Sequence, residues 1–322
     1  MSHYLVTGGA GFIGSHLSQF LLERGDTVLC LDELNDFYDP AIKDENLAIL
    51  KAYEGFSFIK GDICDRQLVD KLFSENHFDG VLHMAARAGV RPSLETPALY
   101  GEVNILGTTH LLEAAREHKI SRFIFASSSS VYGGNTLTPF SESHQVPNPE
   151  SPYAATKRAG ELLCKTYHHL YSGDGTFDSM VCLRFFTVYG PRQRPEMAIS
   201  KFVSLLLNGE AIPMFGDGST QRDYTYIDDI INGVVRATDE ARGFRIYNLG
   251  GQDPIRLDDL IQVIGKVVGV DAQIDQLPMQ PGDVRTTSAD CSLAKKELGY
   301  EPTVNMTEGV RRYLEWHMKN RI

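Results

Sequence analysis

Residues 7–14, Thr7-Gly8-Gly9-Ala10-Gly11-Phe12-Ile13-Gly14, form a glycine-rich turn between an apolar run at 4–6 and an amphipathic run at 12–24. This order predicts a strand, a tight turn and a helix. Glycines let backbone N–H groups approach a pyrophosphate at the helix N-terminus, although glycines also make ordinary turns. The stretch predicts a dinucleotide site whose candidate ligands are Gly8, Gly11, Phe12, Ile13 and Gly14.

The rest of the N-terminal half repeats this alternation of short apolar runs and longer amphipathic stretches. The predicted strands are Tyr4–Val6, Thr27–Leu31, Phe56–Ile59, Gly80–His83, Arg122–Ala126 and Met180–Phe185. Such alternation is typical of parallel βαβ units. From about Gly190 the pattern is less regular and richer in Pro and Gly. We therefore expect an α/β fold, a doubly wound parallel sheet of the Rossmann type over residues 1–189, with a return segment near 220–245. A smaller α/β substrate-binding domain should occupy mainly residues 190–322.

Composition excludes several classes of partner. The chain has 322 residues, 42% of them hydrophobic, and a formal net charge of −11, which repels nucleic acid. No run approaches the roughly 18 apolar residues of a membrane span, and the start of the chain does not resemble an export signal. The cysteines number five and form no CxxC pair, which favours a reducing, cytoplasmic location. The histidines show no ligand spacing, so we expect no metal.

Acidic residues follow the second and third predicted strands. Asp32 lies near the spacing at which a carboxylate accepts the adenosine ribose hydroxyls, although it could also be an ordinary loop acid. Between Glu33 and Ile42 the chain has no Lys or Arg to neutralise a 2′-phosphate, which favours NAD over NADP. Asp62 and Ile63 could hold adenine, but Asp62 could equally cap the next helix.

A candidate base lies at the start of a later predicted helix. Ser151 is a suitable N-cap, and Tyr153 and Lys157 are spaced i, i+4 on one helix face. An ammonium and a cationic nicotinamide would favour the phenolate of a tyrosine whose ordinary pKa is about 10. A second candidate is the serine run 127–130, which ends an apolar strand at the sheet edge where ligands bind. Each pattern alone also fits a simpler role, as a solvated helix face or a serine-rich turn.

Taken together, these motifs resemble the extended short-chain dehydrogenase/reductase superfamily, and within it the nucleotide-sugar epimerases and dehydratases. The matching stretches are TGGAGFIG, HMAA, SSSSVYG, YAATK, RFFTVYGPR and RDYTYIDD in residues 5–230, and GDVRTTSAD at 282–290. The sequence is most similar to UDP-glucuronate 4-epimerases, because of the loop 34–39, the stretch Ala88-Gly89-Val90-Arg91 and Thr187, where many relatives have Asn.

The resemblance implies roles for individual residues. Tyr153 would be the base, Lys157 would lower its pKa and hold the nicotinamide ribose, and Ser128 would bridge the sugar 4-hydroxyl to Tyr153. Ala85 and Ala86 of the HMAA stretch would contact NAD. The residues implied at the UDP-sugar are Arg91, Ser129, Ser130, Thr187, Arg194, Lys201, Phe202, Phe215, Arg222 and Arg285. Several relatives have an arginine where this chain has Gln280, and Arg285 could replace it.

The resemblance also implies a reaction, 4-epimerisation of UDP-glucuronic acid to UDP-galacturonic acid through a 4-keto sugar. The alternatives on the same scaffold are epimerisation of another UDP-sugar and decarboxylation of UDP-glucuronate. Ser129 and Ser130 stand where dehydratases have an Asp-Glu pair, which argues against dehydration. A catalytically silent dinucleotide-binding regulator is the alternative outside catalysis. Relatives commonly dimerise through helices that correspond here to Thr96–His118 and Pro152–Tyr171, so we expect a homodimer.

Overall fold

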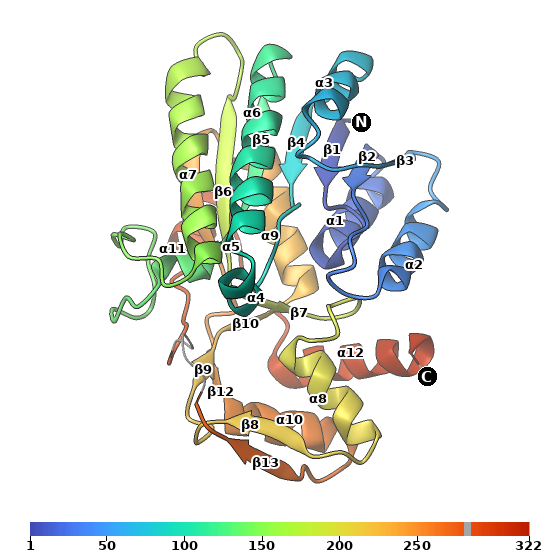
Figure 1. Ribbon diagram of the computed structural model, residues 1–322, viewed down its shortest axis with the longest axis vertical. Helices are drawn as coiled ribbons and strands as arrows, with labels where there is room; N and C mark the ends of the chain where they lie inside the picture. The colour runs from blue at the N-terminus through green and yellow to red at the C-terminus, as the bar shows by residue number, and fades with distance from the viewer. Residues whose placement is uncertain (280–284, 322) are drawn as a thin grey trace.

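A computed structural model of the chain describes residues 1–279 and 285–321, and its main feature is a parallel seven-stranded sheet (Figure 1). The order β11-β6-β5-β4-β1-β2-β3 reverses direction between β1 and β4, as in a doubly wound fold. The prediction of a doubly wound parallel sheet is therefore confirmed. Its strands are β1 (His3–Thr7), β2 (Thr27–Asp32), β3 (Phe56–Lys60), β4 (Gly80–His83), β5 (Arg122–Ser128), β6 (Ser179–Phe185) and β11 (Gly243–Leu249).

Helices cover both faces of this sheet, and successive residues of each strand are buried against opposite faces. On β1, Leu5 packs with the cluster under α3, α6 and α7, whereas Tyr4 and Val6 pack with the cluster under α1 and α9. The helices are α1 (Phe12–Glu23), α2 (Pro40–Leu50), α3 (Arg66–Glu75), α4 (Val90–Glu95), α5 (Pro97–Gly101), α6 (Thr108–Glu117), α7 (Pro152–Tyr171) and α9 (Ile227–Glu240). A π-helical segment, η1 (Glu102–Gly107), joins α5 to α6, and a 3-10 turn, η2 (Ser129–Tyr132), follows β5.

The seventh strand comes from the C-terminal half of the chain. α9 packs on α1, β5 and β6, and β11 extends the sheet by pairing in parallel with β6. The predicted return segment near 220–245 overlaps these two elements, and β11 was not among the predicted strands. Its sequence, GFRIYNL, has the β-branched and aromatic residues of a strand but lies where the regular alternation has already ended.

The remaining C-terminal elements form a smaller layer at the carboxyl edge of the sheet (Figure 1). Three short strand pairs occur there, β7 with β10, β9 with β12 and β8 with β13. The strands are β7 (Thr187–Tyr189), β8 (Ile212–Phe215), β9 (Gln221–Arg222), β10 (Tyr224–Tyr226), β12 (Ile255–Arg256) and β13 (Ile274–Leu277). The helices of this layer are α8 (Ala198–Leu207), α10 (Leu257–Val268) and α12 (Met306–Asn320), whereas α11 (Ser292–Leu298) packs on α9 and β11 beside the large sheet. We propose the predicted division near residue 189 as the boundary between the two domains.

Candidate active site

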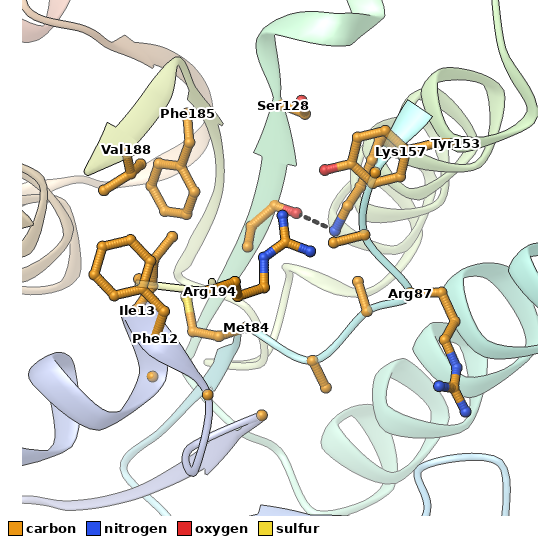
Figure 2. Close-up of a pocket in the computed structure, with 18 of the residues that line it drawn as sticks. Phe12, Ile13, Met84, Arg87, Ser128, Tyr153, Lys157, Phe185, Val188 and Arg194 are labelled. Carbon is orange, nitrogen blue, oxygen red and sulfur yellow. Dashed lines mark hydrogen bonds between the residues drawn. The ribbon is translucent and has the colours of Figure 1, made fainter. Parts of the chain in front are cut away.

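A cleft of about 500 Å³ lies between the carboxyl edge of the large sheet and the C-terminal layer. Its walls carry segments that are distant in sequence, including the glycine turn, the serine run, the start of α7 and residues 185–188 (Figure 2). Ligands of doubly wound sheets bind in this position, outside the strand ends where the strand order reverses. The cleft is therefore the candidate active site.

The glycine turn lines one end of the cleft. Gly8 has φ +67, and a Cβ atom there would lie 2.7 Å from the Ala85 nitrogen, so a side chain is excluded. A Cβ atom on Gly14 would lie 2.2 Å from the Gly8 carbonyl oxygen, which shows how closely α1 approaches the turn. Gly11 is the N-cap of α1 and provides no side chain to cap its first N–H groups. These N–H groups therefore fit a pyrophosphate, whose charge the helix dipole stabilises.

Two acidic residues lie at the ends of the neighbouring strands and line the same end of the cleft. The Asp32 carboxylate accepts hydrogen bonds from the Ala10 nitrogen at 3.1 Å and from the Leu34 nitrogen at 2.9 Å. Asp62 accepts from the Cys64 nitrogen at 2.9 Å. The cap of α3 is Asp65, not Asp62. Of the two interpretations of Asp62, capping of that helix is therefore wrong, and its side chain stays a candidate for adenine.

The candidate base and its neighbours come from α7 and β5. Ser151 caps α7 by accepting from the Ala154 nitrogen at 3.1 Å, which fixes the first helical turn and with it Tyr153. Tyr153 points its hydroxyl toward the cleft, and Lys157 lies beside it (Figure 2). The Lys157 ammonium donates to the Ala126 carbonyl oxygen at 2.6 Å.

Burial controls the ionisation of both groups in the absence of ligands. Burial raises the pKa of Tyr153, while a hydrogen bond from Ser128 and the charge of Arg194 lower it. Burial lowers the pKa of Lys157 to about 7. Without ligands, the cleft therefore disfavours both the Tyr153 phenolate and the Lys157 ammonium. A positively charged ligand beside Tyr153 would stabilise the phenolate and so lower the pKa of the tyrosine.

The serine run presents several hydroxyls to the cleft. Ser128 caps η2 by accepting from the Ser130 nitrogen at 3.2 Å, and the Ser130 hydroxyl donates to Ser128 Oγ at 2.8 Å. Ser129 also lines the cleft, as does Ser127, whose hydroxyl donates to the buried Glu161 carboxylate at 2.7 Å. The Ser127 hydroxyl is thus engaged in holding the strand to α7.

Thr187, Arg194 and Arg222 also line the cleft. The Thr187 nitrogen donates to the Asp223 carbonyl oxygen at 3.0 Å, whereas its hydroxyl forms no hydrogen bond within residues 1–279 and 285–321. Arg194 extends into the middle of the cleft (Figure 2), with its guanidinium 3.1 Å from Glu196. Arg222 donates to the carbonyl oxygens of Gln221 and Arg285. The cleft therefore offers two guanidinium groups and a hydroxyl to an anionic ligand.

The structure does not bring every predicted site residue to the cleft. The predicted residues that line it are Gly8, Gly11, Phe12, Ile13, Gly14, Asp32, Asp62, Ile63, Ala85, Ala86, Ser128, Ser129, Ser130, Tyr153, Lys157, Thr187, Arg194 and Arg222. Arg91, Lys201, Phe202, Phe215 and Arg285 lie outside the lining, with the Arg91 guanidinium over the Phe215 ring at 5.4 Å. Gln280 lies outside the described residues.

Two groups of polar residues near the cleft are not among the predicted site residues. Lys43 and Glu33 line the glycine-turn end of the cleft together with Arg87, which the sequence leaves open between a solvated loop residue and a substrate contact. Glu161 and Arg184 form a buried ion pair beneath the serine run, with atoms 2.8 Å apart and both residues about 1% exposed. A sequence signal existed for the second group, because Arg184 interrupts the apolar run MVCLRFF of a predicted central strand.

Other expectations concern metals and membranes. Among the described residues, no group of three or more His, Cys, Asp or Glu side chains is arranged to hold a metal ion. No helix within those same ranges is both long and apolar enough to cross a membrane.

Comparison with known proteins agrees with this geometry. The profile of the GDP-mannose 4,6 dehydratase family matches residues 5–313. A UDP-glucuronate 4-epimerase from Thermodesulfobacterium geofontis is 43% identical over 321 residues, covering 99% of this chain and 97% of the relative. Among solved structures, the UDP-glucuronic acid 4-epimerase of Bacillus cereus in complex with UDP-glucuronic acid and NAD has a TM-score of 0.91 and 38% identity, covering 98% of this chain and 99% of the other.

Proteins of different specificity share the same architecture. The UDP-glucose 4-epimerase of Thermotoga maritima, solved with UDP-glucose, has a TM-score of 0.91 and 32% identity, covering 99% of this chain and 100% of the other. The fold therefore does not distinguish these substrates, and the side chains of the cleft must. From the profile match over nearly the whole length and the full-length relatives, the chain belongs to the GDP-mannose 4,6-dehydratase family of nucleotide-sugar epimerases and dehydratases.

Proposed function

We propose that this chain is an NAD-dependent epimerase that converts UDP-glucuronic acid into UDP-galacturonic acid by inverting C4 of the sugar. One observation carries the proposal: Ser128, Tyr153 and Lys157 meet in a cleft that also holds the glycine turn and Thr187. A silent regulator would have no need of this set. Full-length relatives named as UDP-glucuronate 4-epimerases support the choice of substrate.

Tyr153 would act as the base. Its hydroxyl points into the cleft, where it would accept the proton of the sugar 4-hydroxyl as C4 is oxidised. Ser128 would hold that hydroxyl and Tyr153 together. Bound NAD would supply the hydride acceptor. Lys157, held by the Ala126 carbonyl oxygen, would donate to the nicotinamide ribose, and its positive charge together with that of the nicotinamide would favour the phenolate.

The glycine turn and Asp32 would hold the cofactor. The N–H groups at the uncapped start of α1 suit the pyrophosphate, and Asp32 lies at the end of β2, where a carboxylate binds ribose hydroxyls. Asp62, Ile63, Ala85 and Ala86 would line the remainder of the site.

Inversion requires the 4-keto sugar ring to rotate, so that its opposite face receives the hydride when it is reduced again. The sugar end of the cleft would hold the uridine diphosphate through Arg222 while the ring rotates. The 4-keto intermediate is a β-keto acid, so its carboxylate must be kept out of alignment with the carbonyl π system. The Thr187 hydroxyl and the Arg194 guanidinium, which both line the cleft, would hold the carboxylate and so disfavour loss of CO₂.

A substrate panel tests the proposal. The purified protein is incubated without added cofactor with UDP-glucuronate, UDP-galactose or UDP-N-acetylglucosamine, and the products are separated by chromatography. We expect UDP-galacturonate from the first substrate and much slower conversion of the two neutral-sugar substrates. A pentose product would identify a decarboxylase. Faster conversion of a neutral-sugar substrate would identify another epimerase, and absence of all turnover despite NAD binding would identify a regulator.

The proposal extends to assembly and location. Exposed apolar side chains lie on η1 and α7, where Leu106 is 47%, Leu162 49% and Leu170 59% exposed. These residues support a homodimer formed by α7 and the helical stretch from α5 to α6 of each copy. Light scattering after gel filtration should give twice the chain mass, and Leu162→Arg should give the monomer. The five cysteines are free thiols, which supports a reducing, cytoplasmic location.

A further inference from the structure

Two cations reach the ribose end of the cleft from parts of the chain that are distant in sequence. Lys43 lies on α2, with its ammonium 3.8 Å from the Asp32 carboxylate and donating to the Asn35 carbonyl oxygen at 3.1 Å. Arg87 follows β4, with its guanidinium 3.1 Å from the Glu33 carboxylate. Asp32, Glu33, Lys43 and Arg87 all line the cleft. Two carboxylates and two cations thus meet where the adenosine ribose would bind.

The four charges are shielded from water to different degrees. The Lys43 and Asp32 side chains are 5% and 7% exposed, and those of Arg87 and Glu33 are 16% and 27% exposed. Burial lowers the pKa of Lys43, whereas Asp32 and Glu33 raise it. The Nε atom of Arg87 is buried without a hydrogen-bond partner among the described residues. The charge of Lys43 is therefore balanced by Asp32 and that of Arg87 by Glu33, and the Nε–H group of Arg87 is an unused hydrogen-bond donor.

The preference for NAD over NADP already follows from the acidic residue at the end of β2. Beyond that preference, we propose that Lys43 and Arg87 form a latent site for a 2′-phosphate, which their ion pairs with Asp32 and Glu33 keep closed. Asp32 and Glu33 repel that phosphate and occupy the two cations that would bind it. Removing the carboxylates would leave a lysine and an arginine at the ribose, the residue types that bind phosphate most strongly. The proposal rests on the proposed function only in taking a nicotinamide dinucleotide as the cofactor.

The test measures binding and needs no turnover. The dissociation constants of NAD⁺ and NADP⁺ are measured by calorimetry on nucleotide-free protein at low and moderate salt. The proteins are wild type, Asp32→Ser/Glu33→Gln, and that double variant with Lys43→Met added. The matched control adds Lys51→Met instead, because Lys51 is the exposed C-cap of the same helix and does not line the cleft.

We expect the double variant to bind NADP⁺ at least about tenfold more tightly than wild type and NAD⁺ more weakly, since a hydrogen bond to a charged group is worth roughly one to two decades. Lys43→Met should abolish the gain and Lys51→Met should preserve it. The gain should shrink as salt is added. Where the double variant fails to fold, as judged by circular dichroism, Glu33→Gln alone should show a smaller gain by releasing Arg87.

Other results would overturn the inference. NADP⁺ affinity that stays at the wild-type value in the folded variants would contradict a latent site, as would a gain that survives Lys43→Met. A wild type that prefers NADP⁺ would also contradict it. Wild-type protein that binds NAD⁺ but leaves UDP-glucuronate unchanged would refute the proposed substrate and leave this inference standing. Wild-type protein that binds neither dinucleotide would refute both.

Discussion

The two ends of the cleft differ in how the fold builds them. The cofactor end uses residues directly after consecutive parallel strands, such as Gly8 after β1, Asp32 at the end of β2, Asp62 after β3 and Ala85 after β4. The sugar end collects its residues from β5, β7 and β9 and from an irregular segment near Thr287. All predicted cofactor residues line the cleft, but only half of the predicted substrate residues do.

This difference follows from what holds each end in place. A parallel sheet brings the carboxyl ends of its strands to one edge, so the position of a residue in its βα unit already places it. The sugar end depends on single long-range contacts instead. The Asp223 carboxylate accepts from the nitrogens of Gly251 at 2.6 Å, Gln252 at 3.2 Å and Ala289 at 2.8 Å. This one side chain joins its own segment, next to Arg222, to residues 251–252 and to residue 289. No periodicity in the sequence predicts these contacts.

The largest expected effect lies where the two ends meet. Tyr153→Phe removes the proton acceptor and keeps the ring, so we expect kcat on UDP-glucuronate to fall by about 10²- to 10⁴-fold, with NAD⁺ affinity nearly unchanged. Steady-state kinetics and calorimetry on the same preparation would check both. Normal turnover by the variant would show that another group is the base.

The next effect tests the buried ion pair of Glu161 and Arg184 beneath the serine run, which lies between the two ends of the cleft. Glu161→Gln leaves Arg184 without its carboxylate in the interior, and breaking a buried ion pair costs roughly 3–5 kcal/mol. Urea unfolding should show this loss. Glu75→Gln, in an exposed pair with Lys71 on α3, is the control and should leave stability almost unchanged. Equal effects of the two substitutions would show that the buried pair has no special role.

A third effect concerns Asp223 and pH. Burial raises the pKa of this carboxyl to about 6, although its backbone hydrogen bonds lower it, whereas in an unfolded chain it is about 3.9. Between these values the folded protein holds more protons, so the contribution of Asp223 to stability is present at low pH and is lost as pH rises to about 6. Two pKa units correspond to about 3 kcal/mol at most.

The experiment compares unfolding free energies of wild type and Asp223→Asn from about pH 4.5 to 7.5. The wild type should lose stability relative to the variant as pH rises through this range, because asparagine does not titrate. A stability difference that is independent of pH would show that the folded protein does not raise this pKa. The sugar end would then be less sensitive to pH than the structure indicates.

The smallest effect separates substrates within the sugar end. Thr187→Val keeps the volume of the side chain and deletes its hydroxyl, which costs roughly 1.5–3 kcal/mol where the partner is charged. Turnover of UDP-glucuronate should fall by about one to two decades, and any residual activity on UDP-galactose should be spared. Some keto intermediate should also lose CO₂, giving a UDP-4-keto-pentose whose release without hydride return leaves NADH visible by its absorbance. Unchanged turnover without CO₂ release would make Thr187 a packing residue.

The sequence by itself determined the doubly wound sheet, the cofactor end of the cleft and the pairing of Tyr153 with Lys157 on one helix face. Each of these depends on local periodicity or on spacing within one βα unit, which is visible in a single stretch of chain. Even so, the sequence does not predict β11, because its strand pattern lies among irregular loops, and Lys43 lies one residue beyond the cation-free stretch 33–42.

Only the tertiary structure decided how the sugar end is assembled and how its charges are balanced. It placed Phe215 beneath Arg91 and outside the cleft, brought Lys43 to Asp32 and Arg87 to Glu33, and tied distant loops to Asp223. These contacts join residues that no repeating pattern relates. Their positions are fixed by long-range packing and by the need to satisfy buried polar groups, so they become visible only in the folded chain.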